Sequence, residues 1–274
     1  MTIAPLHRGG DGTPLVLLHG FTGSWRVWRP LMPALEAHHD VLAPSLPGHA
    51  GAAPPPPAAR LGVPSLVDAV EAQLDAAGIA TAHLAGNSLG GWVALELARR
   101  GRARSVVALS PAGAWSSRRD LDRVIRIIRG SHQALHRAPA LSDRLLRQPW
   151  ARRIGLRAVA ERGDHVPLAD ALDLVADARA CTIVPAFLDW VAGDRPLRGG
   201  PPLDAPLTVA WAERDRTLPF DRYGRPWLEA SGAAELVRLR GVGHVPMLDD
   251  PALVARTILN AARRVDHAHG ALQP

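Results

Sequence analysis

The chain has 274 residues, of which 47% are hydrophobic, and its mean hydropathy is close to zero. This length suits one large domain with an inserted subdomain, and no apolar run approaches the roughly 20 residues that span a bilayer, so we expect no integral membrane association. The formal net charge is +6, yet every basic residue is Arg and none is Lys, which indicates codon bias more than selection for phosphate contacts.

Much of the positive charge falls in residues 115–195, which contain 14 Arg and 10 Asp or Glu. We interpret this surplus as a solvated face, the alternative being attraction of acidic substrates or a membrane surface. No basic run is interleaved with aromatic residues, so we expect no nucleic-acid partner. Cys181 is the single cysteine and excludes an internal disulfide framework, and the first 12 residues lack a signal-peptide pattern, so we expect a cytoplasmic protein.

The first half of the chain alternates between predicted strands and helices. An apolar run at 14–20 predicts a buried strand, and Ser24 can cap the helix that follows it. Residues 40–44 predict the next strand, and Ser65 with Asp68 predicts a capping box at the start of a second helix. The later elements of this half are a strand at 82–86, a helix at 92–100 and a strand at 105–109.

The alternation stops at residues 114–196, which are helix-like, rich in Arg, Leu and Ala, and interrupted by Gly and Pro. Strands at 207–211 and 235–239 and a helix at 251–264 then resume it. The sequence therefore predicts an α/β fold with a mostly parallel central sheet flanked by helices. We expect residues 1–113 and 197–274 to form the core domain and residues 114–196 to form an inserted helical cap.

The strongest chemical signal is the pentapeptide 86–90, Gly-Asn-Ser-Leu-Gly, which satisfies G-x-S-x-G directly after a predicted strand and before a predicted helix. A serine on so sharp a turn needs small flanking residues, because its backbone is strained. The turn exposes the hydroxyl of Ser88 at the carboxyl end of the sheet. We therefore predict Ser88 to be a nucleophile.

A serine nucleophile requires a base and an acid that orients the base. His244 follows the last predicted strand and Asp215 follows the strand before it, so both side chains can reach the same sheet edge as Ser88. Glu213 competes with Asp215 for the role of acid, but the spacing to Pro219 favours Asp215. We predict no metal site, because no His, Cys or carboxylate cluster has ligand spacing.

These segments together resemble the α/β-hydrolase family: the elbow around Ser88, the G-x-G-H-x-P segment around His244, the His19-Gly20 loop and the Leu-Pro-Gly-His segment 46–49. The order Ser, Asp, His is that of the family. The resemblance implies an oxyanion hole formed by the backbone N–H groups of Phe21 and Leu89, with His19 bracing the loop. A serine nucleophile also excludes the dehalogenase and epoxide hydrolase branches, in which aspartate occupies the elbow.

The predicted activity is hydrolysis of a carboxylic ester, thioester or lactone through an acyl-enzyme on Ser88, without a cofactor, on a small and apolar acyl substrate. Because Gly-Asn-Ser-x-Gly-Gly elbows resemble those of enzymes that cleave vinylogous diketones, a carbon–carbon bond hydrolase is the alternative. A perhydrolase, a cofactor-free oxygenase and a non-catalytic binding protein of the same fold stay open, as does the oligomeric state.

Four aromatic residues in the predicted cap can either line an apolar substrate pocket or pack the cap onto the sheet. They are Trp115, Trp150, Phe187 and Trp190. Packing is the reading we favour for the group.

Overall fold

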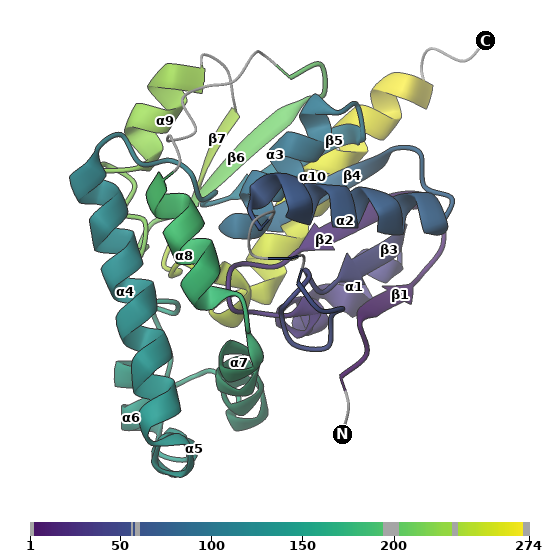
Figure 1. The fold of residues 1–274 in the computed structure, drawn as a ribbon. Helices are drawn as coiled ribbons and strands as arrows, with labels where there is room; N and C mark the ends of the chain where they lie inside the picture. The colour runs from purple at the N-terminus through teal and green to yellow at the C-terminus, as the bar shows by residue number, and fades with distance from the viewer. Residues whose placement is uncertain (1–2, 56, 58–60, 194–202, 232–234, 271–274) are drawn as a thin grey trace.

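A seven-stranded sheet forms the centre of the protein (Figure 1). The computed structural model describes residues 3–55, 57, 61–193, 203–231 and 235–270. The strand order across the sheet is β1-β3-β2-β4-β5-β6-β7. The strands are β1 (Leu6–Gly9), β2 (Thr13–Leu18), β3 (His39–Pro44), β4 (Ala82–Asn87), β5 (Ala103–Leu109), β6 (Leu207–Ala212) and β7 (Glu235–Leu239).

All strand pairs are parallel except β1 with β3, which is antiparallel. The mostly parallel sheet is thus confirmed, and six of its strands are those that the sequence predicts. The edge strand β1 was not predicted, because its four residues contain a single apolar side chain, that of Leu6, which is itself 36% exposed. Such a short polar edge strand carries no buried apolar pattern.

Helices cover both faces of the sheet, and each layer has its own apolar core. One core contains the short 3-10 helix η1 (Trp25–Leu31), α1 (Met32–Glu36) and α10 (Pro251–Gly270). The other contains α2 (Val63–Ala76), α3 (Leu89–Arg99) and α9 (Gly224–Ser231). Central strands that are buried on both faces explain the continuous apolar runs in the sequence.

The helices described between β5 and β6, here called the cap helices, form a lobe beside the carboxyl ends of the strands (Figure 1). They are α4 (Arg118–Arg137), α5 (Pro139–Leu146), α6 (Pro149–Gly155), α7 (Leu168–Ala180) and α8 (Val184–Gly193). Helices α4 and α8 contribute Ile125 and Phe187 to the same core as α2 and α3. The boundary that the sequence predicts at residues 196 and 197 lies outside the described residues.

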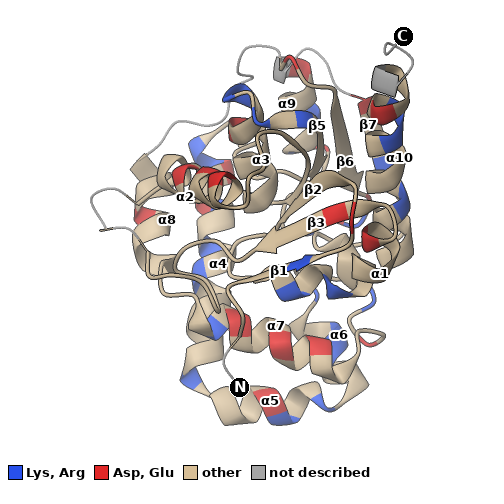
Figure 2. Cartoon of the chain, turned by 90° about the vertical axis from the view of Figure 1, so that its right-hand side faces the viewer, with Lys and Arg blue, Asp and Glu red and all other residues tan. Residues whose placement is uncertain are grey.

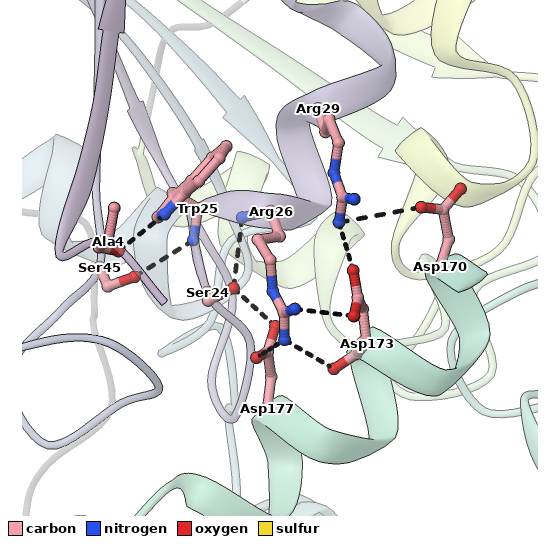
Figure 3. A network of polar contacts seen from close by, with 9 residues as sticks. All are labelled: Ala4, Ser24, Trp25, Arg26, Arg29, Ser45, Asp170, Asp173 and Asp177. Carbon is pink, nitrogen blue, oxygen red and sulfur yellow. Dashed lines mark hydrogen bonds and ion pairs between the residues drawn. The ribbon is translucent and has the colours of Figure 1, made fainter. Parts of the chain in front are cut away.

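A charged network ties cap helix α7 to η1 (Figure 3). The guanidinium of Arg26 donates to Asp173 at 2.7 Å and also to Asp177, and Arg29 donates to Asp173 at 2.5 Å. Ser24 caps η1 by accepting from the Arg26 backbone N–H, and its hydroxyl donates to Asp177 at 2.6 Å. Ser24 therefore caps the helix as predicted and also anchors the cap.

Three predicted helix limits are wrong by two or more residues. Helix α3 begins at Leu89, directly after the turn at Ser88, and not at Trp92. Helix α2 begins at Val63, not at Ser65, whose hydroxyl instead bonds the backbone N–H and carbonyl of Gly62 at 3.1 and 2.9 Å. Helix α10 continues to Gly270, six residues past the predicted end. None of the described helices combines the length and the apolar character that crossing a membrane requires.

Candidate active site

Ser88 lies at the tip of the turn between β4 and α3, with φ = 53° and ψ = −114°, a conformation that non-glycine residues rarely adopt. Glycine is needed on both sides of it. A Cβ on Gly86 would lie 2.2 Å from the carbonyl oxygen of Gly90, and one on Gly90 would lie 2.1 Å from that of Leu18. The glycines of the pentapeptide therefore permit the close approach of strand, turn and helix that holds Ser88 strained.

His244 and Asp215 form a buried pair at the same edge of the sheet. The Asp215 loop follows β6 and the His244 loop follows β7. Nδ1 of His244 lies 2.7 Å from Oδ2 of Asp215, and the Asp215 side chain has no exposed surface. The other carboxylate oxygen, Oδ1, accepts the backbone N–H groups of Thr217 and Leu218 at 2.9 and 2.6 Å. These bonds hold the carboxylate so that it faces the imidazole.

Glu213, the competing candidate for the acid, makes a different contact. Its carboxylate is exposed and accepts the backbone N–H of Gly241 at 2.9 Å. This hydrogen bond lowers the pKa of Glu213 below its ordinary value, as do the neighbouring arginines. The structure therefore brings Asp215, and not Glu213, to the histidine.

Ser88 and His244 line one cavity beneath the cap helices, together with Thr217 from the Asp215 loop. Because Nδ1 of His244 is engaged by Asp215, Nε2 is the ring nitrogen that can serve the hydroxyl of Ser88. The three residues that the sequence predicts as a triad thus follow β4, β6 and β7, whose carboxyl ends share one edge of the sheet.

Phe21 and Leu89, the two predicted oxyanion-hole residues, line a cavity together with Ser88. Leu89 is the first residue of α3, where backbone N–H groups and the helix dipole favour negative charge. Phe21 follows β2 in a loop whose next residue, Thr22, has a positive φ of 66°. Both residues are therefore placed beside the hydroxyl, and their use as donors is a proposal taken up below.

His19 braces this loop from beneath. Its Nε2 accepts the backbone N–H of Leu46 at 2.9 Å, so Nδ1 must carry the proton and donate to the carbonyl of Gly20 at 2.8 Å. Burial lowers the pKa of His19 to about 3 and that of His49, which packs edge-on against both His19 and Phe21, to about 4. Both imidazoles are therefore neutral at pH 7. His19 supports the Phe21 loop through its hydrogen bonds, and His49 supports it through its ring contact with Phe21.

Two further residues hold His244 in place, and neither was singled out from the sequence. Asn87 donates from Nδ2 to the carbonyl oxygens of His244 at 2.9 Å and Leu109 at 3.2 Å. Asp249 is buried, and its Oδ2 accepts the backbone N–H of Gly243 at 2.7 Å. Asn87 could have been noticed because it lies inside the pentapeptide, whereas nothing in the local sequence marks Asp249.

Asp249 also binds the chain between α6 and α7. Its two carboxylate oxygens accept the backbone N–H groups of Glu161 and Arg162 at 2.9 and 2.8 Å. In addition, Val245 donates its backbone N–H to the carbonyl of Val159 at 2.8 Å. The histidine loop is therefore attached directly to the cap helices.

Two of the four cap aromatic residues line the cavity at Ser88: Trp115 and Phe187. Trp190 instead packs against Phe187 and Trp92, with ring centroids 5.6 and 6.2 Å away. Trp150 is 60% exposed on α6, so the favoured reading, that it packs the cap onto the sheet, is wrong for this residue, and its exposure does not fit an enclosed pocket either. A single aromatic residue in a short amphipathic helix gives no sign of which side faces the pocket.

The fold and this site together define a hydrolase of the α/β class. The alpha/beta hydrolase family model matches residues 15–257. Over 199 residues the chain is 37% identical to Epoxide hydrolase EphH of Mycobacterium tuberculosis, a match that covers 70% of this chain and 91% of that protein. The chain belongs to the alpha/beta hydrolase family.

One further relative matches part of the sequence, and one solved structure matches nearly the whole fold. The chain is 39% identical over 113 residues to 2-hydroxymuconate semialdehyde hydrolase of Pseudomonas sp. (strain CF600), which is 39% of this chain and 40% of that protein. The solved structure of an esterase from Thermogutta terrifontis superposes with a TM-score of 0.74 at 19% identity, covering 95% of this chain and 93% of that one. The second likeness shows the shared fold alone.

Proposed function

We propose that the protein is a serine hydrolase that cleaves a carboxylic ester, thioester or lactone through an acyl-enzyme on Ser88. One observation carries the proposal: the buried contact of 2.7 Å between Asp215 and His244, whose imidazole lines the same cavity as the strained Ser88. A carboxylate with no exposed surface, bonded to an imidazole beside a serine, has the arrangement that activates a hydroxyl nucleophile.

In the first half-reaction, Oγ of Ser88 attacks the acyl carbonyl while Nε2 of His244 takes the hydroxyl proton. Asp215 keeps the imidazole in the tautomer with the proton on Nδ1 and stabilises its cationic form. The backbone N–H groups of Leu89 and Phe21 donate to the oxyanion as it forms. His244 then gives its proton to the leaving group, and the acyl group stays on Ser88.

In the second half-reaction, water enters the cavity and gives its proton to His244 as its oxygen attacks the acyl-enzyme. Collapse of the second tetrahedral intermediate releases the acid and returns the proton to Ser88. Asn87 and Asp249 position the histidine loop throughout, because they bond the backbone of His244 and Gly243. The cap helices act as a lid over this site.

Two largely apolar cavities support an apolar substrate. The one that contains Ser88 is lined by Trp92, Trp115 and Phe187. A larger one of about 360 Å³ shares Phe21 with it, lies between the His19-Gly20 loop and the cap helices, and is lined mostly by aliphatic side chains, with Thr22, Asn87 and Ser131 as its polar members. An acyl compound with an apolar group on each side of the scissile bond matches both cavities.

Epoxide opening is disfavoured by the elbow residue. Attack of Ser88 on an epoxide carbon would leave an ether on the enzyme, which has no carbonyl carbon for water to attack, whereas acyl transfer leaves an ester that water can cleave. The relative named as an epoxide hydrolase therefore supports the family assignment more than this reaction.

Carbon–carbon bond hydrolysis is the second candidate. The glycines at 86, 90 and 91 and Asn87 between them resemble the elbow of such enzymes, and the relative named as a 2-hydroxymuconate semialdehyde hydrolase is 39% identical over the matched region. The same Ser-His-Asp groups can serve either reaction, so substrate assays must separate them.

A substrate panel tests the proposal: p-nitrophenyl esters of graded acyl length, a δ-lactone, a vinylogous diketone and styrene oxide. We expect turnover of at least one ester or lactone, and loss of that turnover in Ser88→Ala with an unchanged circular dichroism spectrum. Turnover of the diketone alone would favour the carbon–carbon candidate. Turnover of the epoxide that persists in Ser88→Ala, or no turnover of any compound, would contradict the proposal.

A further inference from the structure

The end of the cap lobe carries an unusual number of exposed apolar side chains. Leu141, Leu145, Trp150 and Ile154 are 55, 40, 60 and 68% exposed, and they are four of the six large apolar residues that are exposed in the described part of the chain. We call α5 and α6, which contain all four, the cap tip. It lies at the end of the lobe farthest from α2 and α3 (Figures 1 and 2).

Each helix of the cap tip presents its apolar pair on one face. Leu141 and Leu145 are four residues apart on α5, and Trp150 and Ile154 are four residues apart on α6, a spacing that aligns side chains along a helix. The two helices pack against each other, and their opposite sides are buried through Leu146 and other residues. The cap tip is thus a pair of short amphipathic helices.

Arginines surround these apolar side chains. Residues 137–157 contain six Arg and one Asp, a surplus of five in a chain whose net charge is +6. Five of the arginines are exposed: Arg137, Arg144, Arg147, Arg153 and Arg157. The one acid, Asp143, is bound by Arg179 of α7 at 2.6 Å. Most of the net positive charge of the protein therefore falls on the segment that contains the cap tip.

The nearby acids of α7 do not offset this charge, because they are engaged by the core. Asp173 and Asp177 bond Arg26, and Asp173 also bonds Arg29, both from η1 (Figure 3). In the described part of the chain, Asp164 is the carboxylate that pairs with a cap-tip arginine, lying 3.3 Å from Arg153. The field around the exposed apolar residues is positive.

The cap tip also borders the entrance to the aliphatic cavity. Ser131 and Ala134 of α4 and Gly155 of α6 line that cavity and are exposed to solvent. Residues that belong both to a cavity wall and to the outer surface mark its mouth. Gly155 adjoins the exposed Ile154, so this mouth opens beside the apolar pair of α6.

We propose that the cap tip docks peripherally on an anionic phospholipid surface, with Trp150 and Ile154 in the headgroup region and the arginines against lipid phosphates. An aromatic and aliphatic face with an arginine border is the composition of an interfacial amphipathic helix. A second copy of the chain would bring arginines against arginines across a symmetric contact. A nucleic acid would pair with the arginines and leave the four apolar side chains without a role.

Docking in this way would bring the mouth of the cavity to the source of an apolar substrate. Helix α6 belongs both to the docking surface and to the cavity wall: Ile154 faces solvent, and Leu156, just after the end of the helix, lines the cavity. A protein docked through α6 therefore has the mouth of the cavity near the lipid. Charge attracts the protein to the surface, and the apolar side chains supply the contact that salt does not screen.

Vesicle sedimentation with the full chain tests the docking. We expect binding to vesicles of phosphatidylcholine with 30% phosphatidylglycerol at least tenfold tighter than to pure phosphatidylcholine, and weaker binding as salt rises. Trp150→Ser with Ile154→Ser, and separately Arg144→Gln with Arg147→Gln, should each weaken partitioning about tenfold or more. The matched control is Arg240→Gln with Arg256→Gln, which removes two exposed arginines outside the cap and should leave binding unchanged.

Thermal melts and hydrolysis of a soluble substrate establish that the variants are folded. If no soluble substrate is known, labelling of Ser88 by a fluorophosphonate probe replaces the hydrolysis assay. Both quantities should match those of wild type, because the substituted side chains are exposed and lie outside the catalytic machinery. Equal binding to neutral and anionic vesicles, or equal loss in the control and arginine variants, would overturn the proposal. Two other results would also overturn it. In the first, wild-type protein does not bind vesicles but self-associates in ultracentrifugation, and Trp150→Ser with Ile154→Ser abolishes that self-association. In the second, Arg144→Gln with Arg147→Gln abolishes DNA binding and leaves vesicle binding unchanged.

Discussion

The carboxylate of Asp249 joins the histidine loop to the cap, and replacing it by asparagine isolates that connection. The native carboxylate accepts three backbone N–H groups, from Gly243, Glu161 and Arg162, at 2.7 to 2.9 Å. In Asp249→Asn, one oxygen becomes an NH2 group that faces at least one of these N–H donors. At least one charge-assisted hydrogen bond is lost, and the remaining ones are made to a neutral amide oxygen.

A hydrogen bond to a charged group contributes about 1.5–3 kcal/mol, so the free energy of unfolding should fall by at least about 2 kcal/mol. For a chain of this size that corresponds to a fall of about 4–8 °C in the melting temperature. A neutral amide oxygen also accepts the N–H of Gly243 more weakly than the carboxylate does, which lets His244 shift relative to Ser88. A displacement near 1 Å can cost about a hundredfold in rate, so we expect kcat/KM to drop about tenfold or more.

Differential scanning fluorimetry and an ester assay measure the two effects, with Asp250→Asn as the control. Asp250 accepts the backbone N–H of Leu253 at 2.8 Å at the start of α10, and asparagine caps a helix about as well as aspartate. Asp250→Asn removes the same charge at the neighbouring position, and we expect it to change the melting temperature and kcat/KM little. Equal melting temperatures and equal kcat/KM for Asp249→Asn and wild type would refute the reasoning.

Three further predictions follow from the site. Asp215→Asn should lower kcat about 10⁴-fold and Glu213→Gln less than twofold in the same assay; the reverse order would move the acid to Glu213. As pH falls from about 6.5 to about 4, His19 and His49 gain protons in the unfolded chain but not in the folded one, because burial lowers their pKa values to about 3 and about 4; urea titrations should show stability falling by about 1.4 kcal/mol per pH unit for each, and His49→Gln should remove about that much from the slope. Trp115→Ala enlarges the cavity at Ser88, so the preferred acyl chain should lengthen in the p-nitrophenyl series, and an unchanged preference would place the acyl group elsewhere.

The sequence predicts most of the sheet because parallel strands leave a strong local signal. Strands such as β4 are buried along their whole length, so each appears as a continuous apolar run between breakers. Strand β1 has no such run, because it is short, lies at the edge and is half exposed. Its place beside β3 depends on backbone hydrogen bonds that any sequence can make.

Local sequence also predicts that Ser88, Asp215 and His244 meet, because each follows a strand of one parallel sheet and the carboxyl ends of such strands share an edge. The supports of His244 could not be predicted in the same way. Asp249 acts through backbone N–H groups from residues 88 and 87 positions earlier in the chain, and backbone donors have no side-chain identity. Long-range contacts of this kind become visible only when the chain is folded.

The cap illustrates a third limit. Its aromatic residues are similar in sequence context, yet Phe187 lines the cavity and Trp150 is exposed on the cap tip. Helices of seven or eight residues, such as α5 and α6, contain too few turns for their apolar spacing to show which face is inside.

Labelling with a fluorophosphonate probe, followed by mass spectrometry of the digested protein, tests directly whether Ser88 is an activated nucleophile. The probe reacts with a serine hydroxyl only when a base activates it, so it requires no knowledge of the substrate. We expect one adduct on wild-type protein, located on the peptide that contains Ser88, and no adduct on Ser88→Ala of the same fold. An unlabelled wild-type protein that is folded, or an adduct that persists in Ser88→Ala, would contradict it.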